Sequence, residues 1–245
     1  MLRVYDGDKI GATAFFRNRP LLETLTRLFR ARGERTLDVL FHASSIGAEP
    51  YSLAAYAAIS GLAAEVQLNI HATDINPNFL ERAKQALYPD EILAGMTAEE
   101  RACFEPHEAG TIRVREDIRA RVTFLPAASF VDFTSEQQFD VVFVLNALNY
   151  VTPEQQTTTM HNIARYNRWL LVTTAFHPDS IESDMVACGY APIDDNIEAI
   201  HNGWIGRVRP STVVQPGSPE YSWVLPAFSQ VEDYRYRFCA LFRKN

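Results

Sequence analysis

The sequence predicts an α/β fold in which a doubly wound, mostly parallel sheet carries a small inserted β subdomain. Three observations predict it. Apolar strand patterns alternate with helix patterns along most of the 245 residues. Residues 37–74 have the order strand, tight turn, helix and strand, and they end in an acid, which is the order of a parallel βαβ unit. Residues 92–117 interrupt this rhythm and mark the insertion.

Residues 1–36 are expected to form a helical segment ahead of the main domain, which covers 37–245. The stretch 20–32 opens with a proline, which suits the first turn of a helix. Its leucines recur at the spacing of one helix side, at Leu21, Leu22, Leu25 and Leu28. This pattern predicts an amphipathic helix.

The βαβ unit begins with residues 37–43, which have the apolar pattern of a buried strand. Residues 44–47 turn the chain, and a helix follows over 49–61. The second strand covers 66–73, and Asp74 closes it. In such a unit the ligand lies at the carboxyl ends of the strands, so the turn and the acid are expected to face one site.

The remaining elements continue the alternation. Within the insertion, a capping-box pattern at 97–100 predicts a short helix, and the alternating residues 111–115 predict a small exposed strand. The other expected helices are 77–87, 153–166 and 178–188, and the other expected strands are 122–125, 139–145, 169–174, 221–225 and 234–242. A loop-rich, lid-like stretch is expected at 190–219.

Composition excludes several classes of protein. The chain has 23 Lys and Arg against 30 Asp and Glu, a net charge of −7, which argues against a nucleic-acid-binding surface or a polybasic membrane contact. No apolar window reaches the ~18 residues of a membrane span, and the charged first residues do not form a signal peptide. The three cysteines are unclustered and the six histidines lack zinc-site spacing. We therefore expect a cytoplasmic protein with reduced thiols and no metal site.

The turn before the first helix of the βαβ unit decides which nucleoside-type cofactor fits. It holds one glycine, Gly47, where a dinucleotide site needs G-x-G-x-x-G. The helix then opens with Glu49, whose carboxylate suits the helix dipole but repels a pyrophosphate. Asp74 is placed to hold a ribose diol. A phosphate-free nucleoside such as S-adenosylmethionine (SAM) therefore fits better than NAD or ATP. The alternative is that Asp74 only caps the next helix.

Further site residues are expected at the carboxyl ends of the later strands. These ends are residues 126–129, the stretch from Asn146 to Tyr150, and residues 175–177. Asn146 and Tyr150 are polar groups after an otherwise apolar strand, and His177 follows the next strand. The alternative for all three is ordinary helix capping and core packing.

Four motifs in one order resemble a known family. They are T-A-F-F-R at 13–17, H-A-S-S-I-G-A-E-P-Y-S at 42–52, A-T-D-I-N at 72–76, and F-D-V-V-F at 139–143 followed by Asn146 and Tyr150. They are similar to the catalytic domain of the chemotaxis receptor methyltransferases, the CheR family, from about residue 13 to residue 174. The resemblance implies a SAM-dependent methyltransferase with a seven-stranded, Rossmann-like sheet.

The resemblance also implies where the cofactor binds. Arg17 would lie at the SAM carboxylate and the active centre, Glu49 and the 44–47 turn would contact the methionine half, and Asp74 would bind the ribose. The positions expected to bind the cofactor are Thr13, Arg17, His42, Ser44, Gly47, Glu49, Asp74, Ile75, Ala128, Ser129, Asn146 and Ala147.

The acceptor side is expected to contain the catalytic groups. A carboxylate acceptor is already ionised at neutral pH, whereas an amine or hydroxyl must lose a proton to a nearby base. The candidate catalytic residues are Arg17, Tyr150, His177 and His201. The candidate substrate-binding residues are Tyr150, His177, Trp204 and Arg207.

Departures from the family pattern lead to the expected acceptor. Leu145 stands where the family has an arginine, Ala128 and Ser129 replace its Asn-Leu pair, and residues 175–178 replace its Gly-x-Ser-Glu turn. The loss of the arginine at Leu145, together with the lid-like stretch, favours a small-molecule acceptor, either a natural-product intermediate or an amino-acid-like metabolite. The alternatives are a protein-glutamate O-methyltransferase of the chemotaxis type and a non-catalytic SAM-binding module.

Overall fold

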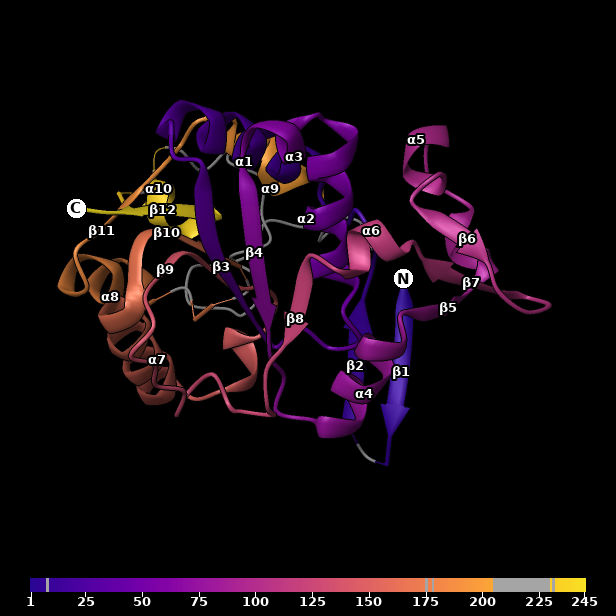
Figure 1. Cartoon of the computed structure of the whole chain (residues 1–245). Coiled ribbons are helices and arrows are strands. Elements are labelled where there is room, and N and C mark those ends of the chain that lie inside the picture. Colours follow the sequence, from indigo (N-terminus) through magenta and orange to yellow (C-terminus); the bar gives the residue numbers. More distant parts are fainter. Residues whose placement is uncertain (8, 175, 178, 205–229, 231) are drawn as a thin grey trace. The chain divides into compact units, whose positions relative to one another are not determined.

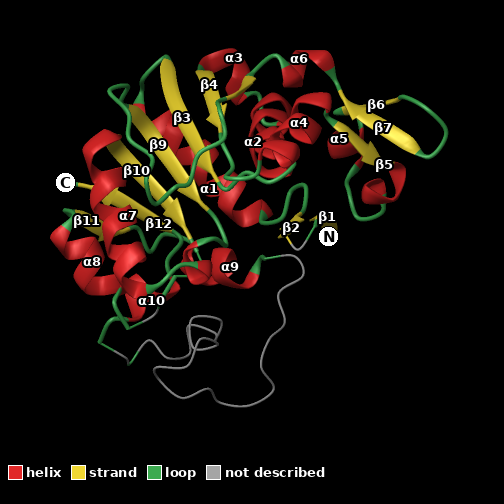
Figure 2. Cartoon of the chain, turned by 90° about the horizontal axis from the view of Figure 1, so that it is seen from below, coloured by secondary structure: helices red, strands yellow, loops and turns green. Residues whose placement is uncertain are grey.

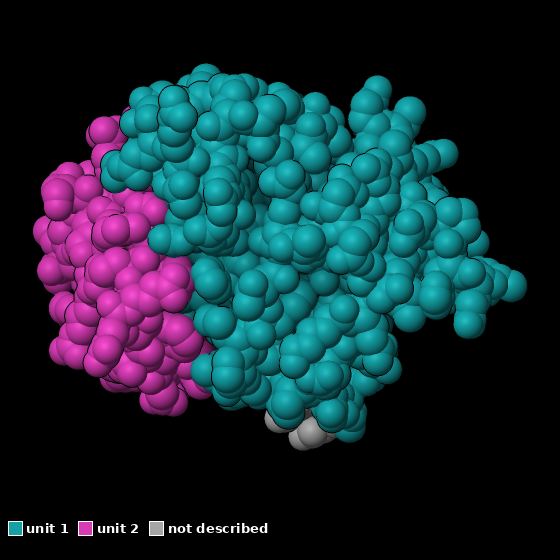
Figure 3. Space-filling model, viewed as in Figure 1, with its two compact units in different colours: residues 1–128 teal, residues 129–245 magenta. Residues whose placement is uncertain are grey.

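The structure is a computed structural model that describes residues 1–7, 9–174, 176–177, 179–204, 230 and 232–245, with the backbone alone at 9 and 10. It divides into two compact units, residues 1–128 and residues 129–245 (Figure 3). The main sheet has seven strands among the described residues, and helices alternate with them along the chain. The expected α/β fold is confirmed. No helix in the described part of the chain is long and apolar enough to span a membrane.

The first unit contributes three parallel strands to the main sheet. They are β3 (Thr36–His42), β4 (Gln67–Ala72) and β8 (Val122–Phe124). Leu37 pairs with Leu68 between β3 and β4, and Ala72 pairs with Phe124 between β4 and β8. These apolar side chains are largely buried, as is typical of a parallel sheet covered on both faces.

Helices of the first unit start and stop where local capping dictates. They are α1 (Arg19–Arg32), α2 (Ala48–Ile59), α3 (Leu62–Glu65), α4 (Pro77–Gln85) and α6 (Glu116–Arg119). The Asn18 side chain accepts a hydrogen bond from the Leu21 N–H at 3.0 Å and so caps α1, and Gly33 ends the helix at φ 74°. Helix α2 packs against β4 and α1 and is buried on nearly all sides. Residues 43–47 connect the end of β3 to the start of α2.

The N-terminal segment contains a β-hairpin in addition to the expected helix. Strands β1 (Leu2–Asp6) and β2 (Lys9–Thr13) pair antiparallel, with Leu2 opposite Thr13. The signal in the sequence is Asp6-Gly7 between two short runs, and Gly7 has φ 60°. The Asp6 carboxylate accepts hydrogen bonds from the side chains of Asn76 (2.9 Å) and Asn78 (3.0 Å), which fixes the hairpin to the start of α4.

The inserted β subdomain is a three-stranded antiparallel sheet in the order β5-β7-β6. Its elements are β5 (Leu87–Pro89), the 3₁₀ helix η1 (Asp90–Leu93), α5 (Ala98–Arg101), β6 (Phe104–Pro106) and β7 (Thr111–Val114). Figure 1 shows this small sheet apart from β3 and β4 in the first unit. It begins at Leu87, earlier than the expected residue 92, because Leu87 pairs with Arg113 across the insertion.

The second unit supplies the other four strands of the main sheet. They are β9 (Phe139–Val144), β10 (Asn167–Thr173), β11 (Tyr190–Pro192) and β12 (Leu241–Lys244). Strands β9 and β10 are parallel, whereas β12 is antiparallel to both β10 and β11 (Figure 2). The helices of this unit are α7 (Pro153–Tyr166), α8 (Ile181–Ala187), α9 (Ile197–Asn202) and α10 (Tyr234–Phe238), and a 3₁₀ helix η2 (Leu148–Tyr150) follows β9.

Two expectations for the second unit are wrong in part. Strand β11 and helix α9 lie in the stretch that was expected to be loop-rich, and residues 234–238 are helical instead of extended. Arg237 donates to the Asp233 carboxylate one helical turn away, at 3.0 Å, and this contact outweighs the alternating Tyr-Arg pattern. The expected strand at 221–225 lies outside the described residues.

Candidate functional site

The turn between β3 and α2, residues 43–47, has an unusual backbone. Ala43, Ser45 and Gly47 all have positive φ, at 49°, 50° and 87°. The Ser44 N–H donates to the Thr73 carbonyl at 3.0 Å, and the Gly47 N–H donates to the Ser44 carbonyl at 2.9 Å. Two non-glycine residues in the left-handed region within one turn carry backbone strain, and such strain collects at ligand sites.

Asp74 joins this turn to the end of β4. One carboxylate oxygen accepts the Ser45 N–H at 2.8 Å, and the other accepts the Asn76 N–H at 2.9 Å. The cap of α4 is Asn76, whose side chain accepts the Asn78 N–H at 3.0 Å. Asp74 is therefore not the helix cap that the sequence left open as an alternative. Its buried carboxylate orders the β3–α2 turn.

Two serine hydroxyls in the turn lack a hydrogen-bond partner among the described residues. Ser44 and Ser45 are 2 % and 8 % exposed, and the Oγ atom of each is buried without a partner. A buried hydroxyl without a partner costs free energy unless a ligand supplies one. The two hydroxyls beside a carboxylate fit the ribose and amino-acid groups of SAM. The sequence singled out Ser44 and included Ser45 only as part of the 44–47 turn.

A second carboxylate, Glu49, opens α2 and contacts the segment after the hairpin. The Thr13 hydroxyl donates to Glu49 Oε2, and a guanidinium nitrogen of Arg17 lies 3.7 Å from Glu49 Oε1. The side chains of Arg17 and Glu49 are 11 % and 16 % exposed. Burial raises the pKa of Glu49, and the contacts with Thr13 and Arg17 oppose that shift only in part. A cationic ligand group such as an ammonium would stabilise the ionised form of a carboxyl group buried in this way.

His42 and Ile75 occupy opposite surroundings at the two strand ends. His42 is the last residue of β3 and is 2 % exposed, and burial lowers the pKa of its imidazole to about 3. It is therefore neutral at physiological pH. Ile75 follows Asp74 and is 62 % exposed, so an apolar side chain stands in solvent next to the buried carboxylate.

In the second unit, the end of β9 has its own strained residue. Asn146 has φ 52°, its N–H donates to the Thr174 hydroxyl at 3.2 Å, and its buried Nδ2 atom has no partner among the described residues. Ala147 is buried, whereas Tyr150 is 81 % exposed.

Residues 128 and 129, after the end of β8, make local hydrogen bonds. The Ser129 hydroxyl accepts from the Val131 N–H at 3.2 Å. Ala128, the last residue of the first unit, donates its N–H to the Asp74 carbonyl at 3.0 Å. The roles of these residues at the cofactor stay predictions.

The two histidines expected to act as bases have other contacts. His177 Nε2 lies 2.5 Å from the Val151 carbonyl, which requires a proton on that nitrogen. His201 is 5 % exposed and packs edge-on against Phe238, with ring centroids 5.1 Å apart. Trp204 is partly buried just after α9. Arg207 lies outside the described residues.

The chain matches the family described as CheR methyltransferase, SAM binding domain, over residues 11–168. The match covers more than half of the 245 residues. It spans the β3–α2 turn, both buried carboxylates and the end of β9. The expected family and the expected cofactor, SAM, are confirmed.

Relatives in several bacteria carry one name. The chain is 32% identical over 163 residues to the chemotaxis protein methyltransferase of Escherichia coli. The aligned region covers 63% of this chain and 54% of that protein. It is 30% identical over 141 residues to the protein of the same name from Vibrio parahaemolyticus, with 55% and 50% covered. It is 32% identical over 159 residues to chemotaxis protein methyltransferase 2 of Pseudomonas aeruginosa, and the aligned region covers 62% of this chain and 56% of that protein. The chain spans about half the length of these relatives.

Solved structures of other methyltransferases are similar at a lower level. Magnesium protoporphyrin IX methyltransferase from Synechocystis is 15% identical with a TM-score of 0.43, over 71% of this chain and 69% of that one. A TehB-like SAM-dependent methyltransferase from Corynebacterium glutamicum is 14% identical with a TM-score of 0.43, over 69% of this chain and 73% of that one.

The expected small-molecule acceptor, and with it the expected small-molecule partner, is wrong. The relatives are named as chemotaxis protein methyltransferases. The expectation depended on Leu145 and on the stretch 190–219, of which residues 190–202 include β11 and α9 and residues 205–219 lie outside the described part. One changed residue at a strand end was too weak a basis for that expectation.

Proposed function

This chain belongs to the CheR methyltransferase family, and on that premise we propose that it transfers the methyl group of SAM to a carboxylate side chain of a protein, as a protein-glutamate O-methyltransferase of the chemotaxis type. The observation that carries the proposal is the family match over residues 11–168, together with relatives named as chemotaxis protein methyltransferases. The buried acids and hydroxyls of the first unit support the cofactor part of the proposal.

The first unit offers one group for each polar part of SAM. The Asp74 carboxylate accepts hydrogen bonds from the ribose hydroxyls. It already accepts one from the Ser45 N–H at 2.8 Å. The hydroxyls of Ser44 and Ser45, which have no hydrogen-bond partner in the described part of the chain, gain partners from SAM. Glu49 pairs with the ammonium of the methionine half, and Arg17 pairs with its carboxylate. These assignments agree with the charge of each side chain.

The chemistry of a carboxylate acceptor suits the described residues. SAM supplies an electrophilic methyl group, and its transfer forms a carbon–oxygen bond to the acceptor while the electron pair of the broken carbon–sulfur bond stays on sulfur. No proton moves, since the acceptor is ionised at neutral pH. The chain therefore needs to orient the acceptor and needs no base. His177, whose Nε2 contacts the Val151 carbonyl, and the buried His201 fit structural roles.

We place the protein in the cytoplasm. Support comes from the three cysteines, Cys103, Cys188 and Cys239, which are all buried and not joined in disulfides. Disulfides are rare in the reducing cytoplasm.

The test is an assay of methyl transfer with labelled SAM and a bacterial lysate separated into protein and metabolite fractions. The expected result is base-labile label in the protein fraction, because methyl esters of carboxylates hydrolyse in base. Arg17→Lys serves as the inactive control, since lysine does not reproduce the planar fork of a guanidinium. Label confined to the metabolite fraction, or base-stable label on protein, contradicts the proposal. Binding of SAM without any transfer contradicts turnover.

A further inference from the structure

The loop that connects β2 to α1, residues 14–18, carries Arg17, and Arg19 is the first residue of α1. The inserted β subdomain contacts this loop at Phe15, before Arg17 in the chain. The Phe15 ring packs edge-on against Tyr88 of β5, with centroids 4.8 Å apart, and against Phe104 of β6, at 5.0 Å. Two strands of the insertion therefore hold the loop two residues before Arg17.

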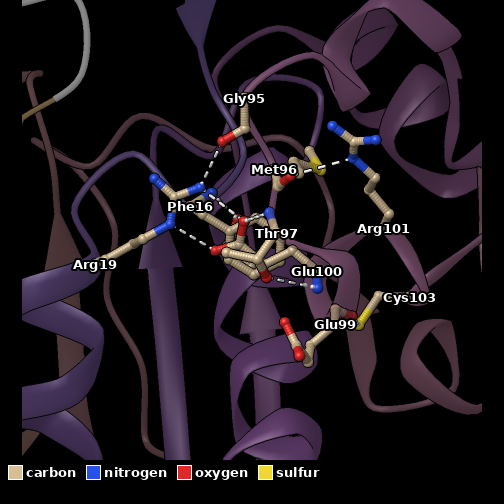
Figure 4. Close-up of polar contacts among 10 residues, drawn as sticks. Phe16, Arg19, Gly95, Met96, Thr97, Glu99, Glu100, Arg101 and Cys103 are labelled. Carbon is tan, nitrogen blue, oxygen red and sulfur yellow. Dashed lines mark hydrogen bonds and ion pairs between the residues drawn. The ribbon is translucent and has the colours of Figure 1, made fainter.

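The insertion also holds the chain two residues after Arg17. Arg19 donates through Nε and a terminal nitrogen to the two carboxylate oxygens of Glu100, both at 2.7 Å (Figure 4). The same terminal nitrogen donates to the Gly95 carbonyl at 2.9 Å. A bidentate pair of this kind sets the direction of the guanidinium as well as its distance. Glu100 is buried and lies 81 residues after Arg19 in the chain.

Glu100 is itself held in place by the start of α5. Its carboxylate accepts the Thr97 N–H at 2.9 Å, and its own N–H donates to the Thr97 hydroxyl at 3.2 Å. This capping box fixes the Glu100 side chain before Arg19 binds it. The carboxylate is thus a rigid acceptor for Arg19.

The loop between these two anchors has a strained conformation. Phe16 has φ 47° and its N–H donates to the Ser52 hydroxyl of α2 at 2.9 Å. A phenylalanine in the left-handed region keeps that conformation only where its surroundings impose it. Arg17 follows directly, 3.7 Å from Glu49. Its position therefore depends on the contacts at Phe15 and Arg19.

We propose that Glu100 and Arg19 are positioning residues for Arg17, so that the inserted β subdomain sets the direction of the arginine that meets the cofactor. This inference rests on the proposed role of Arg17 at SAM. It predicts that breaking the Arg19–Glu100 pair weakens SAM binding even though neither residue is among those proposed to contact the cofactor. A pair that only stabilises the fold would leave SAM affinity unchanged.

The experiment measures SAM affinity by titration calorimetry for Glu100→Gln, together with the melting temperature. Glutamine preserves the capping box but removes the charge and the second acceptor oxygen from the pair. We expect the Kd for SAM to rise about tenfold, the middle of the range for residues coupled in one network. Arg19→Lys, which keeps the charge and loses the fork, is the second variant and should show the same loss.

Arg101→Gln is the matched control. Arg101 lies in the same short helix and donates to the Met96 carbonyl at 3.1 Å, a hydrogen bond within the inserted subdomain. Its removal should leave the Kd unchanged. A melting temperature that falls equally in both variants while only Glu100→Gln loses SAM affinity supports positioning.

A double-mutant cycle with Arg17→Lys separates positioning from a general structural effect. If Glu100 acts through Arg17, Glu100→Gln should change the Kd little once Arg17 is lysine. Equal losses in both backgrounds, or an unchanged Kd in Glu100→Gln and Arg19→Lys, overturn the inference. Failure of the wild-type chain to bind SAM contradicts the proposed function instead, so the two failures are distinguishable.

Discussion

Replacing Asp74 with asparagine tests the cofactor site most directly. The carboxylate accepts two buried backbone N–H groups, from Ser45 at 2.8 Å and from Asn76 at 2.9 Å. An asparagine amide has the same shape but only one acceptor oxygen, so its NH₂ group must face one of the two N–H donors. The substitution therefore disturbs the β3–α2 turn and removes the charge proposed to bind the ribose.

The two consequences have different magnitudes. Leaving one buried N–H without an acceptor costs about 1–3 kcal/mol of folding free energy, which lowers the melting temperature of a chain of this size by about 2–12 °C. Loss of the charge-assisted bond to the ribose costs about 1.5–3 kcal/mol of binding free energy, which is roughly a 10- to 150-fold increase in the Kd for SAM.

Calorimetric titration with SAM and a thermal melt measure the two effects separately. Tyr190→Phe is the matched control, because the Tyr190 hydroxyl donates to Asn167 at 2.8 Å, a buried hydrogen bond in the second unit. The control should lower the melting temperature by a similar amount and leave SAM affinity unchanged. A Kd within twofold of wild type in Asp74→Asn, with the turn destabilised, would refute the role of Asp74 at the ribose and leave it a structural one.

Three further predictions follow from the buried groups of the first unit. Because burial raises the folded-state pKa of Glu49 above its unfolded value, its ionised form destabilises the fold, and Glu49→Gln should raise the melting temperature at pH 7.5. The same variant should bind SAM more weakly and lose the wild-type decline in affinity as pH falls through the pKa of Glu49, measured by titration at several pH values. His42 has the opposite sign: its pKa falls from 6.5 to about 3, so its contribution to stability is lost as pH falls below 6.5, by up to about 1.4 kcal/mol per pH unit. Urea unfolding of His42→Gln should show a flatter acid slope. Gly47→Ala should destabilise the fold by about 2–4 kcal/mol in urea unfolding, since φ is 87° and a Cβ would lie 3.1 Å from Phe124, whereas Gly95→Ala meets nothing within 4 Å and should be nearly neutral.

Each of these predictions has an outcome that contradicts it. Unchanged pH dependence of SAM affinity in Glu49→Gln would remove Glu49 from the ammonium site. An acid slope in His42→Gln equal to wild type would assign that slope to other groups. Equal stability losses in Gly47→Ala and Gly95→Ala would show that the β3–α2 turn tolerates a side chain.

Much of the fold was predictable because its signals are local. The cap at Asn18 and the leucine spacing place α1 at Arg19–Arg32, against an expected 20–32. Buried parallel strands such as β9 are apolar along nearly their whole length. The hairpin and β11 were missed because such short strands depend on their partners: β11 has three residues, one of them Pro192, and exists through its pairing with β12. The alternation at 234–238 indicated a strand, and a contact one turn apart made it a helix.

The sequence by itself determined the family and its cofactor. Asp74 and the turn before Glu49 follow two neighbouring parallel strands, whose carboxyl ends lie at one edge of the sheet. The contact between Asp74 and the turn at Ser45 is therefore a consequence of topology. The tertiary structure alone decided which polar atoms are left without a partner, as at Ser45, and which distant side chains meet, as for Arg19 and Glu100. The physical reason is that hydrogen-bond satisfaction and ion pairing depend on distances of a few ångströms between segments far apart in the chain, and local patterns of residues do not specify such distances.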